Sequence, residues 1–250
     1  MKKIMTVFAL LMCMCAFAAK GTRAERLEAL ECAVADPDCE GPGLDEVAGD
    51  TYVRQMYEMT SDEMVQDLIA LSLKYGVDET NAAHRAARQF AVGRLAYYQA
   101  TNQLEYLTTI WRTPQDYAQK DAVVAAMGMC KGGEGLFDIA NEVVTNAAAF
   151  PAAVRSAVYL RLYSYYSRGC EADVPQVQKD RIAAYFLSRV DLERDPIYAF
   201  LDGKVCEMFP SYRHSQRRRD NLAAVYDPTL TGAPKEVYEA RVRDAQPVGE

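Results

Sequence analysis

Residues 117–128, YAQKDAVVAAMG, decide the expected fold of this chain, because related stretches occur on both sides of them. Residues 82–93 read AAHRAARQFAVG, and residues 152–157 read AAVRSA. Successive copies start about 35 residues apart, a spacing typical of helical repeats. Each copy combines alanines with charged side chains, and the first two copies end in Gly93 and Gly128. The chain is therefore expected to be all-α, with a short array of repeated helix pairs.

Helix start and stop signals surround these copies. Thr60 and Glu63 form a capping box, after which apolar residues recur at helical spacing until Tyr75-Gly76. Further helices are expected from Asn81 to Ala100, from Thr113-Pro114 to Cys130, through Leu136 and Ala147, from Pro151 to Arg168, from Pro175 through Val190, from Asp195-Pro196 through Val205, and from Ser211 to Tyr226. No stretch of strand length alternates apolar and polar residues convincingly, so a sheet is not expected.

Two of the quoted stretches, KDAVVAAMG (120–128) and AVRSA (153–157), resemble the second helices of HEAT-like α-solenoids. The resemblance covers roughly residues 61–226. It implies a short α-solenoid of antiparallel helix pairs, in which neighbouring pairs stack and leave an extended surface for partners. An irregular helical bundle is the alternative fold. A tetratricopeptide-like array competes on the spacing of four residues, Gly128, Ala140, Ala147 and Pro151.

The N-terminal 18 residues have the features of a cleavable secretory signal peptide. Lys2 and Lys3 form a basic start, an apolar run extends from Ile4 to Cys15, and Ala16-Phe17-Ala18 supplies the small residues that signal peptidase requires. Cleavage is expected after Ala18. The apolar run is short for a membrane span, and no later segment resembles one. The mature protein is therefore expected to be secreted or periplasmic, without an integral membrane segment.

The mature chain is expected to consist of three parts. Residues 19–60 hold an N-terminal helix and a loop that a disulfide between Cys32 and Cys39 closes, because the exported chain meets an oxidising compartment. Residues 61–226 form the helical-repeat domain, and residues 227–250 form a C-terminal appendage. Loss of Lys2 and Lys3 changes the formal net charge from −7 to −9, which disfavours binding to nucleic acid.

Catalytic and cofactor motifs are absent from the sequence. His84 and His214 are the two histidines, and they lie far apart, so no His-rich metal cluster and no HExxH pair is present. The chain also lacks a P-loop, a dinucleotide fingerprint and a nucleophile elbow. We therefore expect no metal and no cofactor, and a non-catalytic protein is favoured over an enzyme.

A tyrosine stripe is the first candidate binding feature. Tyr159, Tyr163 and Tyr166 follow one another at i, i+4 and i+7 on one expected helix, and Arg155 lies on the same helix. Such a stripe is suited to gripping a peptide or stacking on a sugar. The alternative is that the tyrosines pack between neighbouring helices and carry no ligand.

A basic block is the second candidate. Residues 213–219 read RHSQRRR, and Arg217 and Arg218 are the positions expected to meet an anionic polymer or an acidic partner surface. Consecutive arginines on a helix point in different directions, however, and Asp220 partly compensates their charge. The alternative is a solvated helix face.

These features favour an exported helical-repeat scaffold that binds a protein partner or an envelope polymer without catalysis. The alternative function is a hydrolase-like enzyme that acts on cell-envelope material. Acidic and tyrosine side chains converging in a pocket would favour the enzyme.

Overall fold

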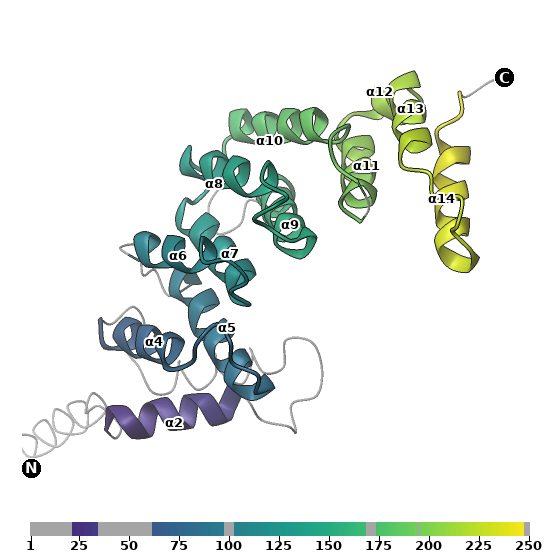
Figure 1. Ribbon diagram of the computed structural model, residues 1–250. Coiled ribbons are helices and arrows are strands. Elements are labelled where there is room, and N and C mark those ends of the chain that lie inside the picture. The colour runs from purple at the N-terminus through teal and green to yellow at the C-terminus, as the bar shows by residue number, and fades with distance from the viewer. Residues whose placement is uncertain (1–21, 35–61, 98–102, 169–173, 195, 248–250) are drawn as a thin grey trace, which may run out of the picture. The chain divides into compact units, whose positions relative to one another are not determined.

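The computed structural model describes residues 22–34, 62–97, 103–168, 174–194 and 196–247. Within these ranges the chain forms twelve helices and no strand (Figure 1), which confirms the all-α fold class. The chain divides into two compact units, Met1–Cys130 and Lys131–Glu250. The boundary lies inside residues 61–226, which the sequence assigns to one helical-repeat domain. The predicted signal peptide lies outside the described residues, and so does Cys39 of the predicted Cys32–Cys39 disulfide.

The first unit is organised around α5. Its helices are α2 (Arg23–Val34), α4 (Asp62–Lys74), α5 (Ala82–Tyr97), α6 (Leu104–Trp111) and α7 (Gln119–Met129). α5 packs against α2, α4 and α7, and α6 packs against α7. Ala87 and Ala91 of α5 and Ala122 and Ala126 of α7 are fully buried. Because these side chains are small, the helix backbones can approach one another closely.

Local sequence signals account for α4 and for the start of α5. Met64, Leu68 and Leu71 are buried as their spacing predicts, and burying each such side chain stabilises the fold by roughly 1.5–3 kcal/mol. The helix ends before Gly76, as expected. At the start of α5 the Asn81 carboxamide oxygen accepts hydrogen bonds from the backbone N–H groups of Ala83 (2.9 Å) and His84 (3.3 Å).

The start of α7 differs from the prediction. The sequence places a helix start at Thr113-Pro114, whereas α7 begins at Gln119. Gln115 adopts the left-handed backbone conformation, with φ of 61°, and this turns the chain away from a helix. The turn brings the Asp116 carboxylate to the Arg88 guanidinium of α5, with two hydrogen bonds of 2.6 and 2.7 Å. A long-range ion pair therefore outweighs the local helix-start signal.

The second unit holds the remaining helices. They are α8 (Gly135–Val144), α9 (Ala152–Arg168), α10 (Gln176–Arg189), α11 (Ile197–Met208), α12 (Pro210–Arg213), α13 (Gln216–Ala224) and α14 (Gly232–Asp244). Each packs mainly on its neighbour in the sequence, and α9 also packs on α11. The starts of α9, α10 and α11 follow Pro151, Pro175 and Pro196, as the sequence predicts.

The C-terminal helices differ from the prediction of one long helix capped by Ser211. The chain forms the short α12, breaks at His214, and begins α13 after Ser215. The Ser215 hydroxyl oxygen accepts a hydrogen bond from the backbone N–H of Arg218 at 3.1 Å, so Ser215 is the residue that caps the helix. α14 lies within residues 227–250, which the sequence assigns to a C-terminal appendage.

Buried arginine–carboxylate pairs join helices in both units. Arg26 of α2 lies 2.9 Å from Asp67 of α4, Arg88 of α5 pairs with Asp116, and Arg218 of α13 lies 2.9 Å from Asp202 of α11. Both partners of each pair are nearly inaccessible to solvent. A buried ion is tolerated only when a partner compensates it, so these pairs fix which helices lie together.

None of the described helices is both long enough and apolar enough to cross a bilayer.

Candidate functional site

The tyrosine stripe of α9 runs from the core of the second unit to its surface. Tyr159 has 0 % of its surface exposed, whereas Tyr163 and Tyr166 are half-buried. The Tyr159 hydroxyl donates a hydrogen bond of 2.8 Å to the Glu193 carboxylate. Burial raises the pKa of Tyr159 far above its ordinary value, so the hydroxyl keeps its proton. Tyr159 therefore belongs to the core and offers no surface to a ligand.

Arg155 is held by the same carboxylate. Its Nη1 lies 2.6 Å from Oε2 of Glu193, and Nη2 of Arg189 lies 3.2 Å from Oε1. Glu193 itself is 2 % exposed. The carboxylate thus binds the hydroxyl of Tyr159 and two guanidinium groups, and it ties the end of α10 to α9. Arg155 stabilises this junction and is not free to meet an anionic ligand.

Tyr163 and Tyr166 belong to a second cluster, which α11 completes. The two tyrosine rings stack with centroids 6.2 Å apart and planes inclined by 26°. The edge of Phe200 of α11 meets the Tyr163 ring at 6.2 Å, with the planes at 90°. Offset-stacked and edge-to-face arrangements are the favourable geometries for aromatic pairs.

Lys204 and Glu207 of α11 complete this cluster. The Lys204 Nζ lies 4.0 Å from the centroid of the Tyr163 ring, and the Tyr163 hydroxyl donates to Glu207 at 2.6 Å. Lys204 also donates to Glu207 at 3.0 Å. The hydrogen bonds from Tyr163 and Lys204 lower the pKa of Glu207, so it is ionised at neutral pH. We call the set the α9–α11 aromatic face: Tyr163, Tyr166, Phe200, Lys204 and Glu207.

The sequence indicates only the two tyrosines of the α9–α11 aromatic face. The Tyr163 and Tyr166 spacing on α9 is visible in the sequence, whereas Phe200, Lys204 and Glu207 belong to another helix, α11. Positions 200, 204 and 207 repeat the i, i+4, i+7 spacing of the tyrosines. That second stripe is the signal that could have found them.

The predicted basic block does not form a free cationic surface. The Arg217 guanidinium donates to Asp191 through Nε, to Oδ1 at 3.1 Å and to Oδ2 at 2.9 Å, and through Nη2 to Oδ2 at 2.6 Å. Nη2 also donates to the carbonyl oxygen of Leu187 at 2.7 Å. Arg217 remains half-exposed, but its guanidinium is committed to the end of α10. Its contacts therefore connect α13 to α10 within the second unit.

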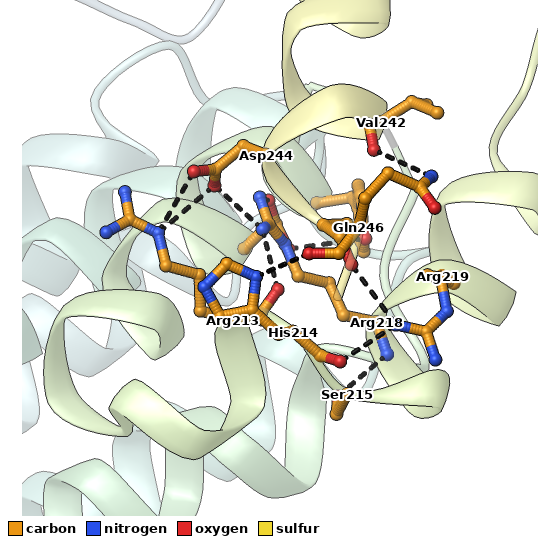
Figure 2. A network of polar contacts seen from close by, with 11 residues as sticks. Arg213, His214, Ser215, Arg218, Arg219, Val242, Asp244 and Gln246 are labelled. Carbon is orange, nitrogen blue, oxygen red and sulfur yellow. Dashed lines mark hydrogen bonds and ion pairs between the residues drawn. The ribbon is translucent and has the colours of Figure 1, made fainter. Parts of the chain in front are cut away.

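Arg218 is buried, with 3 % of its side chain exposed. It makes two hydrogen bonds of 2.9 Å to the Asp202 carboxylate. A further hydrogen bond of 2.8 Å joins it to Asp244 (Figure 2). The two carboxylates belong to other helices of the unit, Asp202 to α11 and Asp244 to α14. Arg218 therefore has no accessible donor for an anionic ligand and is excluded from the candidate surface.

The other residues of the block hold the end of α14 (Figure 2). Arg213 Nε lies 3.1 Å from a carboxylate oxygen of Asp244, and His214 Nδ1 donates to the carbonyl oxygen of Gln246 at 2.8 Å. Arg219 donates to the carbonyl oxygen of Ala245 at 3.2 Å. Carbonyl groups at a helix C-terminus lack partners within the helix, so cationic donors there are favourable.

A third polar cluster, around His84, lies in the first unit. The His84 ring stacks on Tyr75 with centroids 4.2 Å apart, and its Nδ1 lies 3.2 Å from a Glu79 oxygen. Glu31 of α2 accepts hydrogen bonds from the Tyr75 hydroxyl and from Lys74. Burial opposes ionisation of Glu31, but these hydrogen bonds outweigh it and lower its pKa. The cluster joins α2, α4 and α5.

Neither a metal-ligand group nor a known relative adds to this description. In the part of the chain that the structure describes, no three His, Cys, Asp or Glu side chains are arranged to hold a metal ion. Cys206 is a free thiol. The chain matches no protein-family model, no curated protein and no solved structure.

Proposed function

We propose that this protein is an exported helical scaffold that binds a protein partner or an envelope polymer through the α9–α11 aromatic face. The observation that carries the proposal is the half-buried pair Tyr163 and Tyr166, which Phe200 and Lys204 hold in place. Rigid aromatic side chains with accessible surface are characteristic of binding sites, because they bury much area with little loss of conformational entropy.

The proposed architecture is a short HEAT-like solenoid, and the packing of the second unit supports it. Most of its helices pack on the next helix in the chain, as repeat arrays require. An irregular bundle is the competing arrangement. The proposed location, secreted or periplasmic, rests on the charged, apolar and small-residue segments of residues 1–18.

Capture of partners from crosslinked native envelopes tests the scaffold proposal. The tagged protein is expected to retain a stoichiometric partner, identified by mass spectrometry or glycan analysis, and Tyr166→Ala is expected to lose it. Tyr226→Ala is the matched control, because Tyr226 is 51 % exposed and lies beyond the C-terminus of α13, outside the face. Equal capture by the wild type and by Tyr166→Ala would contradict the assignment of the face.

A hydrolase acting on envelope material is the second candidate, and the cluster around His84 is the observation in its favour. There Glu31, Tyr75 and His84 converge, and the lowered pKa keeps Glu31 deprotonated, the form that a general base requires. Release of reducing sugar or of new amino groups from isolated envelopes is the assay. Activity that disappears in Glu31→Gln and persists in the exposed control Glu28→Gln would favour the hydrolase. If the wild type releases neither product, the hydrolase proposal is excluded.

A further inference from the structure

Gly203 leaves the backbone of α11 uncovered beside the aromatic face. It lies in the interior of the helix, three residues after Phe200 and four before Glu207, so the three residues share one side of α11. A Cβ atom built on Gly203 meets no atom within 4 Å. Glycine in a helix interior destabilises the helix by roughly 0.5–1 kcal/mol relative to alanine. Since no neighbouring atom requires glycine here, an approaching ligand is a physical reason for its presence.

The charges of the face compensate each other. Lys204 and Glu207 form an ion pair of 3.0 Å, and the Tyr163 hydroxyl donates to the same carboxylate. The face therefore presents no unbalanced charge to an anionic polymer or to a charged peptide. It does present hydrogen-bonding groups of both kinds, because the ammonium donates and the half-exposed carboxylate accepts.

The apolar surface around the face is too limited for a hydrophobic protein anchor. Of the large hydrophobic side chains on the described parts of α9 and α11, Leu160 is the one that is mostly exposed, at 56 %. Protein hot spots are well-packed apolar pockets with a desolvated centre. Aromatic faces beside paired donors and acceptors instead match a sugar ring, whose C–H groups stack on the negative face of an aromatic ring while its hydroxyls form hydrogen bonds.

We propose that the ligand of the α9–α11 aromatic face is a neutral carbohydrate, stacked on Tyr166 and seated against the bare backbone at Gly203. This inference rests on the proposed binding function and narrows it to one class of ligand. Glu207 and Lys204 supply the acceptor and the donor for sugar hydroxyls, and Tyr163 orients the Tyr166 ring through their stacking contact.

Affinity electrophoresis of the full mature chain tests the inference. Each native gel contains one probe. The neutral probes are dextran, glucomannan and soluble chitin oligosaccharides that contain no chitosan, and the anionic probe is alginate. Retardation by at least one neutral probe is expected, and it is expected to persist at high salt, because uncharged contacts are not screened. Tyr166→Ala is expected to weaken the retardation about tenfold, which corresponds to the loss of one aromatic stacking contact.

Two further variants test the stacking on Tyr166 and the access of the ligand to the backbone at Gly203, separately from any effect on folding. Tyr166→Phe keeps the ring and is expected to bind like the wild type. Gly203→Gln covers the bare backbone with a good helix former, so it is expected to fold and to lose binding about tenfold or more. Tyr226→Ala is expected to bind normally. Unchanged circular dichroism in all four variants shows that a loss of binding is not a loss of fold.

The outcomes distinguish the ligand class from the binding function. No retardation by any neutral probe, or binding to alginate alone that disappears with salt, overturns the carbohydrate inference. Capture of a protein partner that depends on Tyr166, without carbohydrate binding, also overturns it but leaves the scaffold proposal intact. If neither a carbohydrate nor a Tyr166-dependent partner is found, both proposals fail.

Discussion

A buried ion pair, Arg88 with Asp116, connects three parts of the first unit. The Asp116 carboxylate accepts both Arg88 hydrogen bonds and a third from the backbone N–H of Ala118 at 2.9 Å. Arg88 in turn donates through Nε to the carbonyl oxygen of Ser72 at 3.0 Å. One ion pair therefore connects the end of α4, the middle of α5 and the approach to α7.

Removal of one partner of this pair is expected to destabilise the protein strongly. In Asp116→Ala the Arg88 charge stays buried without compensation, which costs about 3–5 kcal/mol. Urea unfolding of the wild type and the variant measures the difference. Asp138→Ala, at an exposed position of α8, is the control and is expected to stay within about 0.5 kcal/mol of the wild type. A cost below about 1 kcal/mol for Asp116→Ala would show that the pair contributes little.

Gly203→Ala is expected to act in the opposite direction. Because the added methyl group meets no atom within 4 Å, the helix gains the alanine preference without a clash. The free energy of unfolding should rise by about 0.5–1 kcal/mol. Thermal unfolding followed by circular dichroism measures the change. A decrease in stability would mean that the glycine serves the fold, and would remove one argument for a ligand beside it.

At the scale of helices, local signals predict starts that depend on adjacent residues and fail where distant residues intervene. Pro151 and Asn81 act through their own backbone or nearest neighbours, and the sequence places α9 and α5 correctly. Thr113-Pro114 fails because Arg88, a residue of another helix, holds Asp116 in a turn. Ser211 fails because the chain breaks at His214 before α13 can begin.

Acidification is expected to release the end of α14. The pKa of Asp244 lies below its ordinary value, because Arg218 donates to it, burial opposes this only partly, and Arg213 adds a second cation. A carboxylate with a lowered pKa stabilises the folded state above its unfolded pKa, near 3.9, and this stabilisation disappears as the pH falls through the folded pKa. Hydrogen-exchange protection of residues 232–244, corrected for intrinsic rates, should therefore decrease in acid.

A pair of variants checks the origin of this pH effect. Asp244→Asn is expected to lower the protection of α14 already at neutral pH. Glu239→Gln is the matched control on the same helix, because its exposed contacts to Lys235 and Arg243 are 3.8 and 4.0 Å long. Equal protection in both variants would contradict a role for Asp244.

At the scale of the whole molecule, composition and periodicity predict the fold class but only part of the candidate site. The regular spacing of Tyr159, Tyr163 and Tyr166 gives no indication that the first is covered and the others are not. That difference depends on Glu193 and on α11, which lie more than a helix away in the sequence. Likewise, the carboxylates that hold Arg217 and Arg218 are Asp191, Asp202 and Asp244, which lie far from the block in the sequence. The residues of the block alone therefore do not show that these two arginines are paired.

The second unit is expected to fold as a separate chain. Its buried side chains include Phe137, Tyr159, Phe186 and Leu201, and it forms a compact unit by itself. Residues 131–247 should show a helical circular dichroism spectrum and a cooperative thermal transition. Phe186→Ala in this chain is expected to lower the stability by about 3–5 kcal/mol. A gradual, non-cooperative transition of the unmodified chain would show that the unit needs the rest of the protein.

The carboxylate of Glu193 also sets a rule for recombining this protein. Donors from α9 and from the last turn of α10 meet on that one side chain. An exchange of segments that carried α9 into another scaffold without residues 189–193 would leave the Arg155 guanidinium and the Tyr159 hydroxyl in the interior without the carboxylate that binds them. In a library of chimeras, viable crossover points are therefore expected before Pro151 or after residue 196, with α9, α10 and their junction inherited as one block.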